Sequence, residues 1–274
     1  MILTYTLMKR LTKFSLPEEV VEYISNKYPQ GIELNKFLTN EDEKYRHEII
    51  RKTHNSIKDE TWEKLTQSKD HDTRCAALYI CPEKYLDTLM INNEEYEIRE
   101  ILAYRQKHLD ILVNDENPKV RFAVAINGKD HHKDQLINDP SWEVRRIIAI
   151  YGKDYHRDQL INDPEWKIRE AIAKFGKDKH RDQLINDPSW QVRLAVSDFG
   201  NYSHRDILVN DPEWQVRKSV AMFGKDYHKD ILVNDPDWRV RAEVAKYGNK
   251  SHKDKLLNDP NDEVRAAAKE IIKK

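Results

Sequence analysis

The sequence has little of several features that define specialised folds. Its two cysteines, Cys75 and Cys81, are too few for a disulfide framework or for a four-ligand zinc or iron–sulfur site, and we expect both to be reduced thiols. It has no run of 18 apolar residues, so no membrane span is expected. Positive and negative charges nearly balance, since the sequence has 47 Lys and Arg and 48 Asp and Glu. These absences predict a cytoplasmic protein without a cofactor or metal, and they weaken the case for a nucleic-acid or membrane partner.

Apolar residues are also scarce for a chain of 274 residues. They make up 39% of the sequence and charged residues 35%, against typical values of about 45–50% and about 25%. A single compact core of this length would need more apolar side chains. Disorder is not expected either, because 6 Trp, 13 Tyr and 6 Phe are too many for a chain that buries nothing. The composition favours a protein whose elements each contact only their neighbours.

A 24-residue repeat fills most of the chain. The segments from Leu136, Leu160 and Leu184 read LINDPSWEVRRIIAIYGKDYHRDQ, LINDPEWKIREAIAKFGKDKHRDQ and LINDPSWQVRLAVSDFGNYSHRDI, and those from Leu208, Leu232 and Leu256 follow the same pattern. Six of the seven glycines, six of the ten prolines and five of the six tryptophans lie at fixed positions of this repeat. Such self-similarity is typical of a solenoid.

An arginine recurs at one position of every repeat and extends the pattern upstream. This column comprises Arg46, Arg74, Arg99, Arg121, Arg145, Arg169, Arg193, Arg217, Arg241 and Arg265. The early intervals vary before they settle at 24, which predicts about ten repeats with the first three divergent. We therefore divide the chain into an N-terminal capping segment (1–36), divergent repeats (37–111) and regular repeats (112–274). Lys269, Glu270, Lys273 and Lys274 are expected to form a polar C-terminal cap.

Each repeat carries signals for the start and end of a helix. Asp139 is expected to cap the helix, Pro140 to occupy its first position and Gly152 to end it in a left-handed conformation. These signals predict a helix from Pro140 to Tyr151, followed by a short α or 3₁₀ helix. In the capping segment, Pro17 predicts the start of a further helix. The predicted fold is all-α, a right-handed α-solenoid.

Comparison of the repeats predicts which face of the long helix is buried. The positions of Val144, Ile148 and Tyr151 are almost always aliphatic, aliphatic and aromatic, so they are expected to face the core. The position of Ile147 varies freely, as do those of Glu143, Arg146 and Ile150. These variable positions are expected to form the exposed face.

Three recurring polar or aromatic positions are interpreted as structural. The Asp and Arg six residues apart are expected to form a ladder in which each Arg bonds an Asp of its own or the adjoining repeat. The ladder comprises Asp139, Arg145, Asp163, Arg169, Asp187, Arg193, Asp211, Arg217, Asp235 and Arg241. Trp142 is expected to stack on Arg145, three residues along the helix. The histidine of each repeat, such as His156, is expected to make a backbone hydrogen bond before the short helix.

No pattern in the sequence indicates catalysis or metal binding. There is no phosphate-binding glycine loop, HExxH motif or nucleophile elbow. One histidine per repeat cannot converge on one ion; only the neighbours His131 and His132 could chelate one, and that signal is weak. The divergent repeats hold His47, His54, His71, Cys75, Cys81 and Trp62 without a recognisable spacing. We expect no catalytic residue.

The repeat DPxWxVRxxVAxxG, with its long and short helix in 24 residues, resembles the leucine-rich repeat variant. Its Asp and Arg six apart also resemble the HEAT-like repeats of bacterial proteins, and repeats this similar are common in bacterial and phage chains. The resemblance covers residues 112–274 firmly and 37–111 loosely. The cysteine cluster that holds an iron–sulfur centre in one such protein is absent here. The resemblance implies an α-solenoid that binds another macromolecule.

The leading functional hypothesis is a non-enzymatic protein-binding scaffold that uses the variable face. The expected partner-binding residues are Glu143, Ile147, Ile150, Lys167, Lys174, Leu194, Met222 and Arg239. The partner is expected to be another protein of unknown identity and the chain itself a monomer.

Two alternatives remain open. One is DNA binding, implied by a resemblance to HEAT-like alkylpurine DNA glycosylases, although the expected face mixes charges of both signs. The other is a structural or self-assembling repeat element, because near-identical repeats can stack end to end.

Overall fold

The structure is a computed structural model that describes residues 2–3, 17–30, 32–40, 45–86 and 95–269. The chain divides into two compact units, Met1–Gly128 and Lys129–Lys274. Both consist of helices packed in succession, so the predicted all-α solenoid is confirmed. Three residues of the predicted C-terminal cap, Glu270, Lys273 and Lys274, lie outside the described ranges.

The first unit contains short helices and one small sheet. Its elements are β1 (Ile2–Leu3), α2 (Glu18–Lys27), β2 (Ile32–Glu33), α3 (Leu34–Leu38), α4 (Arg46–Thr53), η1 (His54–Ser56), α5 (Asp59–Thr66), α6 (His71–Ile80), η2 (Glu83–Tyr85), α7 (Tyr96–Tyr104), α8 (Leu109–Leu112) and α9 (Pro118–Asn127). Strands β1 and β2 pair antiparallel, with Ile2 opposite Glu33. The sequence analysis did not predict this two-residue pair.

The helix predicted in the capping segment is α2. Pro17 precedes it, and Glu18 and Glu19 occupy its first turn, where carboxylates are favoured by the helix dipole. It buries Val20 and Ile24. Beyond it, α4 packs on α6, α6 on α7 and α7 on α9. Each of these four helices carries one member of the arginine column.

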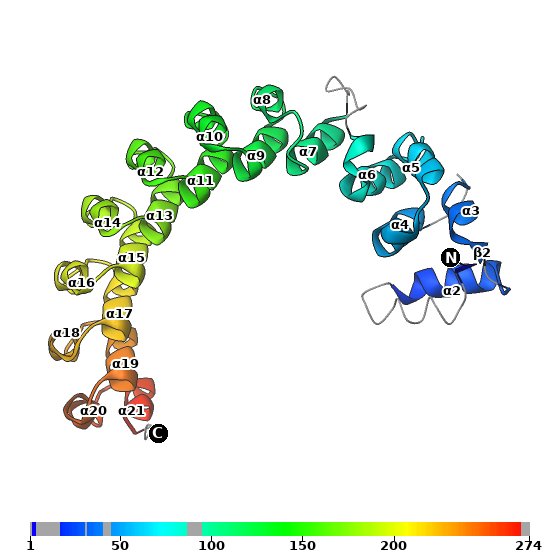
Figure 1. The fold of residues 1–274 in the computed structure, drawn as a ribbon. Helices are drawn as coiled ribbons and strands as arrows, with labels where there is room; N and C mark the ends of the chain where they lie inside the picture. Colours follow the sequence, from blue (N-terminus) through cyan, green and yellow to red (C-terminus); the bar gives the residue numbers. More distant parts are fainter. Residues whose placement is uncertain (1, 4–16, 31, 41–44, 87–94, 270–274) are drawn as a thin grey trace. The chain divides into compact units, whose positions relative to one another are not determined.

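The second unit alternates long and short helices with a constant period (Figure 1). The long helices are α11 (Trp142–Tyr151), α13 (Trp166–Phe175), α15 (Trp190–Phe199), α17 (Trp214–Phe223), α19 (Trp238–Tyr247) and α21 (Asp262–Lys269). The short helices are α10 (Asp130–Leu136), α12 (Asp154–Leu160), α14 (Asp178–Leu184), α16 (Tyr202–Leu208), α18 (Asp226–Leu232) and α20 (Lys250–Leu256). Successive long helices pack directly on one another, and the short helices lie along one side of them.

The long helices begin two residues later than predicted. Helix α11 starts at Trp142, and Pro140 lies before it rather than in its first position. The Asp139 carboxylate accepts a hydrogen bond from the Ser141 backbone N–H (2.8 Å), two residues ahead. An Asp that bonds its own backbone in this way forms a turn in place of a helical cap. The predicted capping role of Asp139 is therefore wrong.

The glycine after each long helix is needed for space rather than for a left-handed backbone. Gly176 has φ −81° and ψ 178°, an extended conformation open to any residue. A Cβ at Gly176 would lie 2.5 Å from the carbonyl oxygen of Ile172 and 2.8 Å from Nδ1 of His180. The left-handed conformation predicted at this column is wrong, because the constraint comes from the close approach of the next short helix.

A histidine holds the start of each short helix. The backbone N–H of Lys177 donates to Nδ1 of the buried His180 (2.9 Å), which confirms the predicted backbone bond. The same bond recurs at His132, His156, His204, His228 and His252. These histidines close the first turn as members of a capping box.

A buried cation, which the sequence analysis missed, lies at the end of four long helices, α11, α13, α15 and α17. Arg157 Nε donates to the carbonyl of Ala149 and its Nη2 to that of Ile150, both at 2.9 Å. These carbonyls have no partner within the helix, and a cation is favoured at this end of the dipole. Arg181 makes the same two bonds, whereas Arg205 bonds the carbonyl of Asp198 through Nη2 and Lys229 bonds that of Gly224. In the parts of the chain that the structure describes, no helix is both long and apolar enough to cross a membrane.

We expect Gly176→Ala to lower the free energy of unfolding by about 1–3 kcal/mol, because the added methyl group overpacks the contact with Ile172 and His180. Denaturant unfolding followed by circular dichroism measures this. The control Gln183→Ala, at an exposed position of α14, should change it by less than about 0.5 kcal/mol. Equal stability of Gly176→Ala and the native chain would contradict the steric role.

Candidate binding surface of the regular repeats

The Arg–Asp ladder joins each repeat to the next. Arg193 donates from Nε and Nη2 to the two carboxylate oxygens of Asp211, at 2.7 and 2.9 Å, and from Nη1 to the carbonyl of Asp187, at 2.8 Å. Arg145 makes the same bonds to Asp163 and Asp139. The five carboxylate pairs in the second unit are Arg145–Asp163, Arg169–Asp187, Arg193–Asp211, Arg217–Asp235 and Arg241–Asp259. Each Arg therefore bonds its own repeat through a carbonyl and the following repeat through a carboxylate.

The ladder is largely removed from solvent. The Arg193 and Asp211 side chains are 11% and 3% exposed. The hydrogen bonds that Arg193 donates to Asp211 raise the pKa of Arg193, and those that Arg241 donates to Asp259 lower the pKa of the Asp259 carboxyl. These guanidinium groups are thus already paired and are not presented to a phosphate.

A degraded ladder continues in the first unit. Arg99 bonds Asp115 (2.6 Å) in the regular way, whereas Arg74 bonds Glu95, which stands in the place of an Asp. Arg46 lies 3.7 Å from Asp70. Arginines of the column therefore still lie near carboxylates of the next repeat where the repeat length varies.

The tryptophans are half-buried between repeats, but their cation partners differ from those expected. The Lys167 Nζ lies 4.1 Å from the ring centroid of Trp142, and the guanidinium carbon of Arg239 lies 3.5 Å from that of Trp214. Both cations come from the repeat after the ring. The predicted stacking of Trp142 on Arg145 is wrong, because Arg145 extends towards Asp163.

The histidines make a second contact between repeats. His180 Nε2 lies 3.0 Å from Asp158 of the preceding repeat, and His204 and His252 bond Asp182 and Asp230 in the same way. Because Nδ1 accepts the backbone bond, the hydrogen-bond network assigns the proton of the neutral ring to Nε2.

One residue expected on the exposed face is buried. Ile147 is 7% exposed, and the equivalent Ala171 and Ala195 are also buried. This column packs towards the adjoining long helix, where side chains of several sizes fit. The prediction of Ile147 as a partner-binding residue is therefore wrong.

One column expected in the core is exposed instead. Its members form what we call the aromatic row: Tyr151, Phe175, Phe199, Phe223 and Tyr247. Their exposed fractions range from 39% at Tyr247 to 62% at Tyr151. Each is the last residue of its long helix, where the chain turns away and leaves the ring uncovered. The position holds a Phe or Tyr in these five repeats although a large part of each ring is exposed.

The other predicted partner-binding residues lie at the surface to different degrees. Glu143 and Met222 are exposed, whereas Ile150, Lys167, Lys174, Leu194 and Arg239 are half-buried. Lys167 and Arg239 cover tryptophan rings, as described above. Met222 directly precedes Phe223 and widens the apolar surface there.

Charges beside the aromatic row are mostly paired. Lys174 bonds Glu170 (2.7 Å), and Lys218 lies 3.3 Å from Glu243. Asp198 directly precedes Phe199, accepts a hydrogen bond from Ser219 and has its pKa raised by burial. The surface is therefore mixed in charge and locally neutralised.

The divergent repeats bring one histidine and one cysteine together. His71 Nε2 lies 3.5 Å from Cys75 Sγ, beside an open cleft of about 390 Å³ that Cys75, Tyr79 and Ile101 help to line. Burial raises the pKa of Cys75 to about 11, so its sulfur is held as a thiol and not as a nucleophilic thiolate. Cys81 and Trp62 are buried, His47 is half-buried and His54 is exposed.

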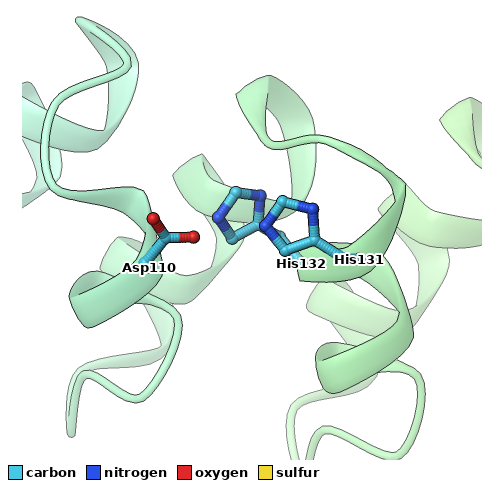
Figure 2. A group of neighbouring side chains, drawn as sticks. All are labelled: Asp110, His131 and His132. Carbon is cyan, nitrogen blue, oxygen red and sulfur yellow. The ribbon is translucent and has the colours of Figure 1, made fainter.

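The neighbours His131 and His132 lie on α10. Figure 2 shows their rings, whose centroids are 3.9 Å apart. His132 accepts the Lys129 backbone N–H at its Nδ1, which is the capping bond of the other repeats. That nitrogen is already used in the fold.

Comparison with known proteins identifies the fold. No model of a protein family matches the chain, and no curated protein matches it. A solved leucine-rich repeat variant matches over 76% of this chain and 79% of its own, with 22% identity and a TM-score of 0.51. A designed armadillo repeat protein matches over 86% and 97%, with 15% identity and a TM-score of 0.17, too low to carry an argument. The predicted resemblance to the leucine-rich repeat variant is confirmed for the fold.

We expect Arg193→Met to lower the free energy of unfolding by about 3 kcal/mol, because it leaves the buried Asp211 carboxylate without its cation. Chemical denaturation provides the measurement. The matched control Lys179→Met breaks an exposed pair with Asp158 and should change it by under about 0.5 kcal/mol. Similar effects of the two substitutions would mean that the ladder does not hold the repeats together.

We expect stability to fall as the pH is lowered below about 6.5, because burial holds the pKa of His228 below its usual value although Asp206 opposes the shift. Between the two pKa values the unfolded chain binds more protons than the folded chain, so protonation favours unfolding. The variant His228→Gln keeps an acceptor for the cap and loses the titration. Its denaturation midpoint should therefore vary less between pH 7 and about pH 5; an unchanged pH dependence would count against this assignment.

Proposed function

We propose that the chain is a non-enzymatic, protein-binding solenoid whose second unit holds its partner along the aromatic row. The observation that carries this proposal is that one position is a Phe or Tyr in five successive repeats while its side chain faces solvent. A recurring aromatic residue with no enclosing core is more consistent with binding than with folding.

Several of the other constant positions have a role inside the fold. The Arg and Asp join repeats, the histidine caps the short helix and the glycine leaves room for that histidine. The aromatic row has no comparable role. Exposed aromatic side chains contribute strongly to interfaces, because their rigid rings bury apolar area at a small entropic cost. A line of five therefore supports a binding surface.

Specificity would come from the variable residues beside the row. In the column directly before the row, Ile150 and Met222 offer apolar contacts, whereas Lys174 and Asp198 are polar, and Leu194 offers a further apolar side chain at another variable column. A repeat solenoid can thus combine a constant set of anchors with a changing set of neighbours.

The same surface gives little support to the DNA-binding alternative. The recurring arginines bond carboxylates, and Lys174 and Lys218 lie beside Glu170 and Glu243. Nucleic-acid binding depends on cations that neutralise several phosphates. A protein partner fits this mixed and partly apolar surface better.

The test is affinity capture from the native host by the full chain. We expect the triple variant Phe175→Ala, Phe199→Ala and Phe223→Ala to retain at least about tenfold less partner, because it removes three anchors. Its circular dichroism should not change, since the rings are exposed. The matched control replaces two exposed residues of the short helices, Ile207→Ala and Ile231→Ala, and should capture normally. Normal capture by the triple variant would contradict the proposed surface.

A further inference from the structure

We infer that the segment bound along the aromatic row is a proline-rich chain in the polyproline II conformation. This inference rests on the proposed function and adds the chemistry of the partner. It is argued from the spacing of the rings, their apolar character and the neutral charge beside them.

The spacing of the row matches the pitch of polyproline II. Successive long helices pack directly against each other, and packed helix axes lie about 8–10 Å apart. Because every ring ends its own helix, the row presents one ring in each such interval. A polyproline II chain has three residues per turn at about 3.1 Å each, so every third side chain returns to the same side after about 9.3 Å. This pitch lies within the range of packed helix axes.

In other peptide conformations, the distance between side chains on one face differs from the expected spacing of the rings. In an extended strand, residues on one face recur about every 6.7 Å. An α-helix advances about 5.4 Å per turn, so its anchors fall out of register with single rings. In polyproline II, about 13 residues reach across all five rings, from Tyr151 to Tyr247.

The chemistry of proline suits the exposed rings. A pyrrolidine ring is apolar and compact, and it can lie against the face of Phe175, Phe199 or Phe223. Proline has no N–H and polyproline II has no internal hydrogen bonds, so its carbonyls remain free to accept bonds. The hydroxyls of Tyr151 and Tyr247 are suitable donors at the two ends of the row. Such a preformed chain also loses little entropy on binding to an aromatic-lined surface.

The charge of the row also favours an uncharged segment. Arg205, whose guanidinium carbon lies 5.8 Å from the ring centroid of Phe223, is buried and donates to the carbonyl of Asp198. Lys174 is paired with Glu170, and Lys246 Nζ lies 4.9 Å from the ring centroid of Tyr247. A neutral proline-rich chain therefore leaves these pairs intact, whereas a polyanion would have to break them to gain cations.

The probe is an acetylated and amidated oligoproline of 13 residues, titrated into the full chain by isothermal titration calorimetry. We expect saturable binding that is at least about tenfold tighter than that of a seven-residue oligoproline, because more turns contact the row. A blocked Gly-Ser peptide of the same length should bind at least about tenfold more weakly, since it lacks both the rings and the preformed conformation.

Two variants locate the binding. Phe199→Ala should weaken binding of the 13-residue oligoproline about tenfold, whereas Phe199→Tyr, which keeps the ring, should retain it. The control Tyr79→Ala removes an equally exposed ring from the first unit and should have no effect. Circular dichroism of each variant verifies that the fold is intact.

The outcomes separate this inference from the proposed function. Absence of oligoproline binding at about 1 mM, or binding that Phe199→Ala leaves unchanged, would overturn the polyproline II partner. If the native partner still required the aromatic row in that case, the binding surface would stand and only its ligand would be wrong. If the partner also ignored the row, both would fail. Tighter binding of a single-stranded oligonucleotide than of oligoproline would likewise overturn the inference.

Discussion

The two-way bonding of each ladder arginine determines how the repeats are arranged. One guanidinium reaches the carbonyl of its own turn and the carboxylate of the next, so it fixes both the loop before its helix and the neighbour beside it. Bidentate bonds of this kind set distance and orientation together. Because the carboxylates are nearly buried, a mispositioned repeat would leave charges unpaired. The long helices therefore stack with one geometry.

Several smaller contacts complete this arrangement with the same period. The histidine caps the short helix, and the cation after it bonds carbonyls at the end of the preceding long helix. The glycine between the two helices leaves room for the histidine. These contacts account for most of the constant polar positions. The aromatic row is constant, apolar and largely exposed, and this combination is the physical basis of the proposed binding surface.

Much of the fold could be predicted from the sequence because the repeats supply their own comparison. The period, the alternation of long and short helices, the ladder residues and the backbone bond of the histidine all followed from residues that recur. The errors concern positions where neighbouring elements decide the outcome. On an ideal helix the angular position of Tyr151 would face the core, but Tyr151 is the last residue of its helix and lies at the surface. The position of Ile147 holds side chains of different size in different repeats, yet it is buried. The sequence also contained the cation column, since Lys or Arg follows the histidine in each regular repeat.

The one-repeat offset of the ladder has a further consequence for how such a chain can change length. A segment of 24 residues carries one donor for the repeat ahead and one acceptor for the repeat behind, so duplication or loss of a whole segment preserves every bond. Repeats of other lengths also pair in the first unit, but there the separation of Arg and carboxylate changes from one repeat to the next, as in Arg74–Glu95 and Arg99–Asp115. In the last described helix, Arg265 bonds Asp262 of its own first turn in place of a following repeat. Duplication of whole 24-residue segments is therefore favoured, because it keeps the hydrogen bonds of the ladder.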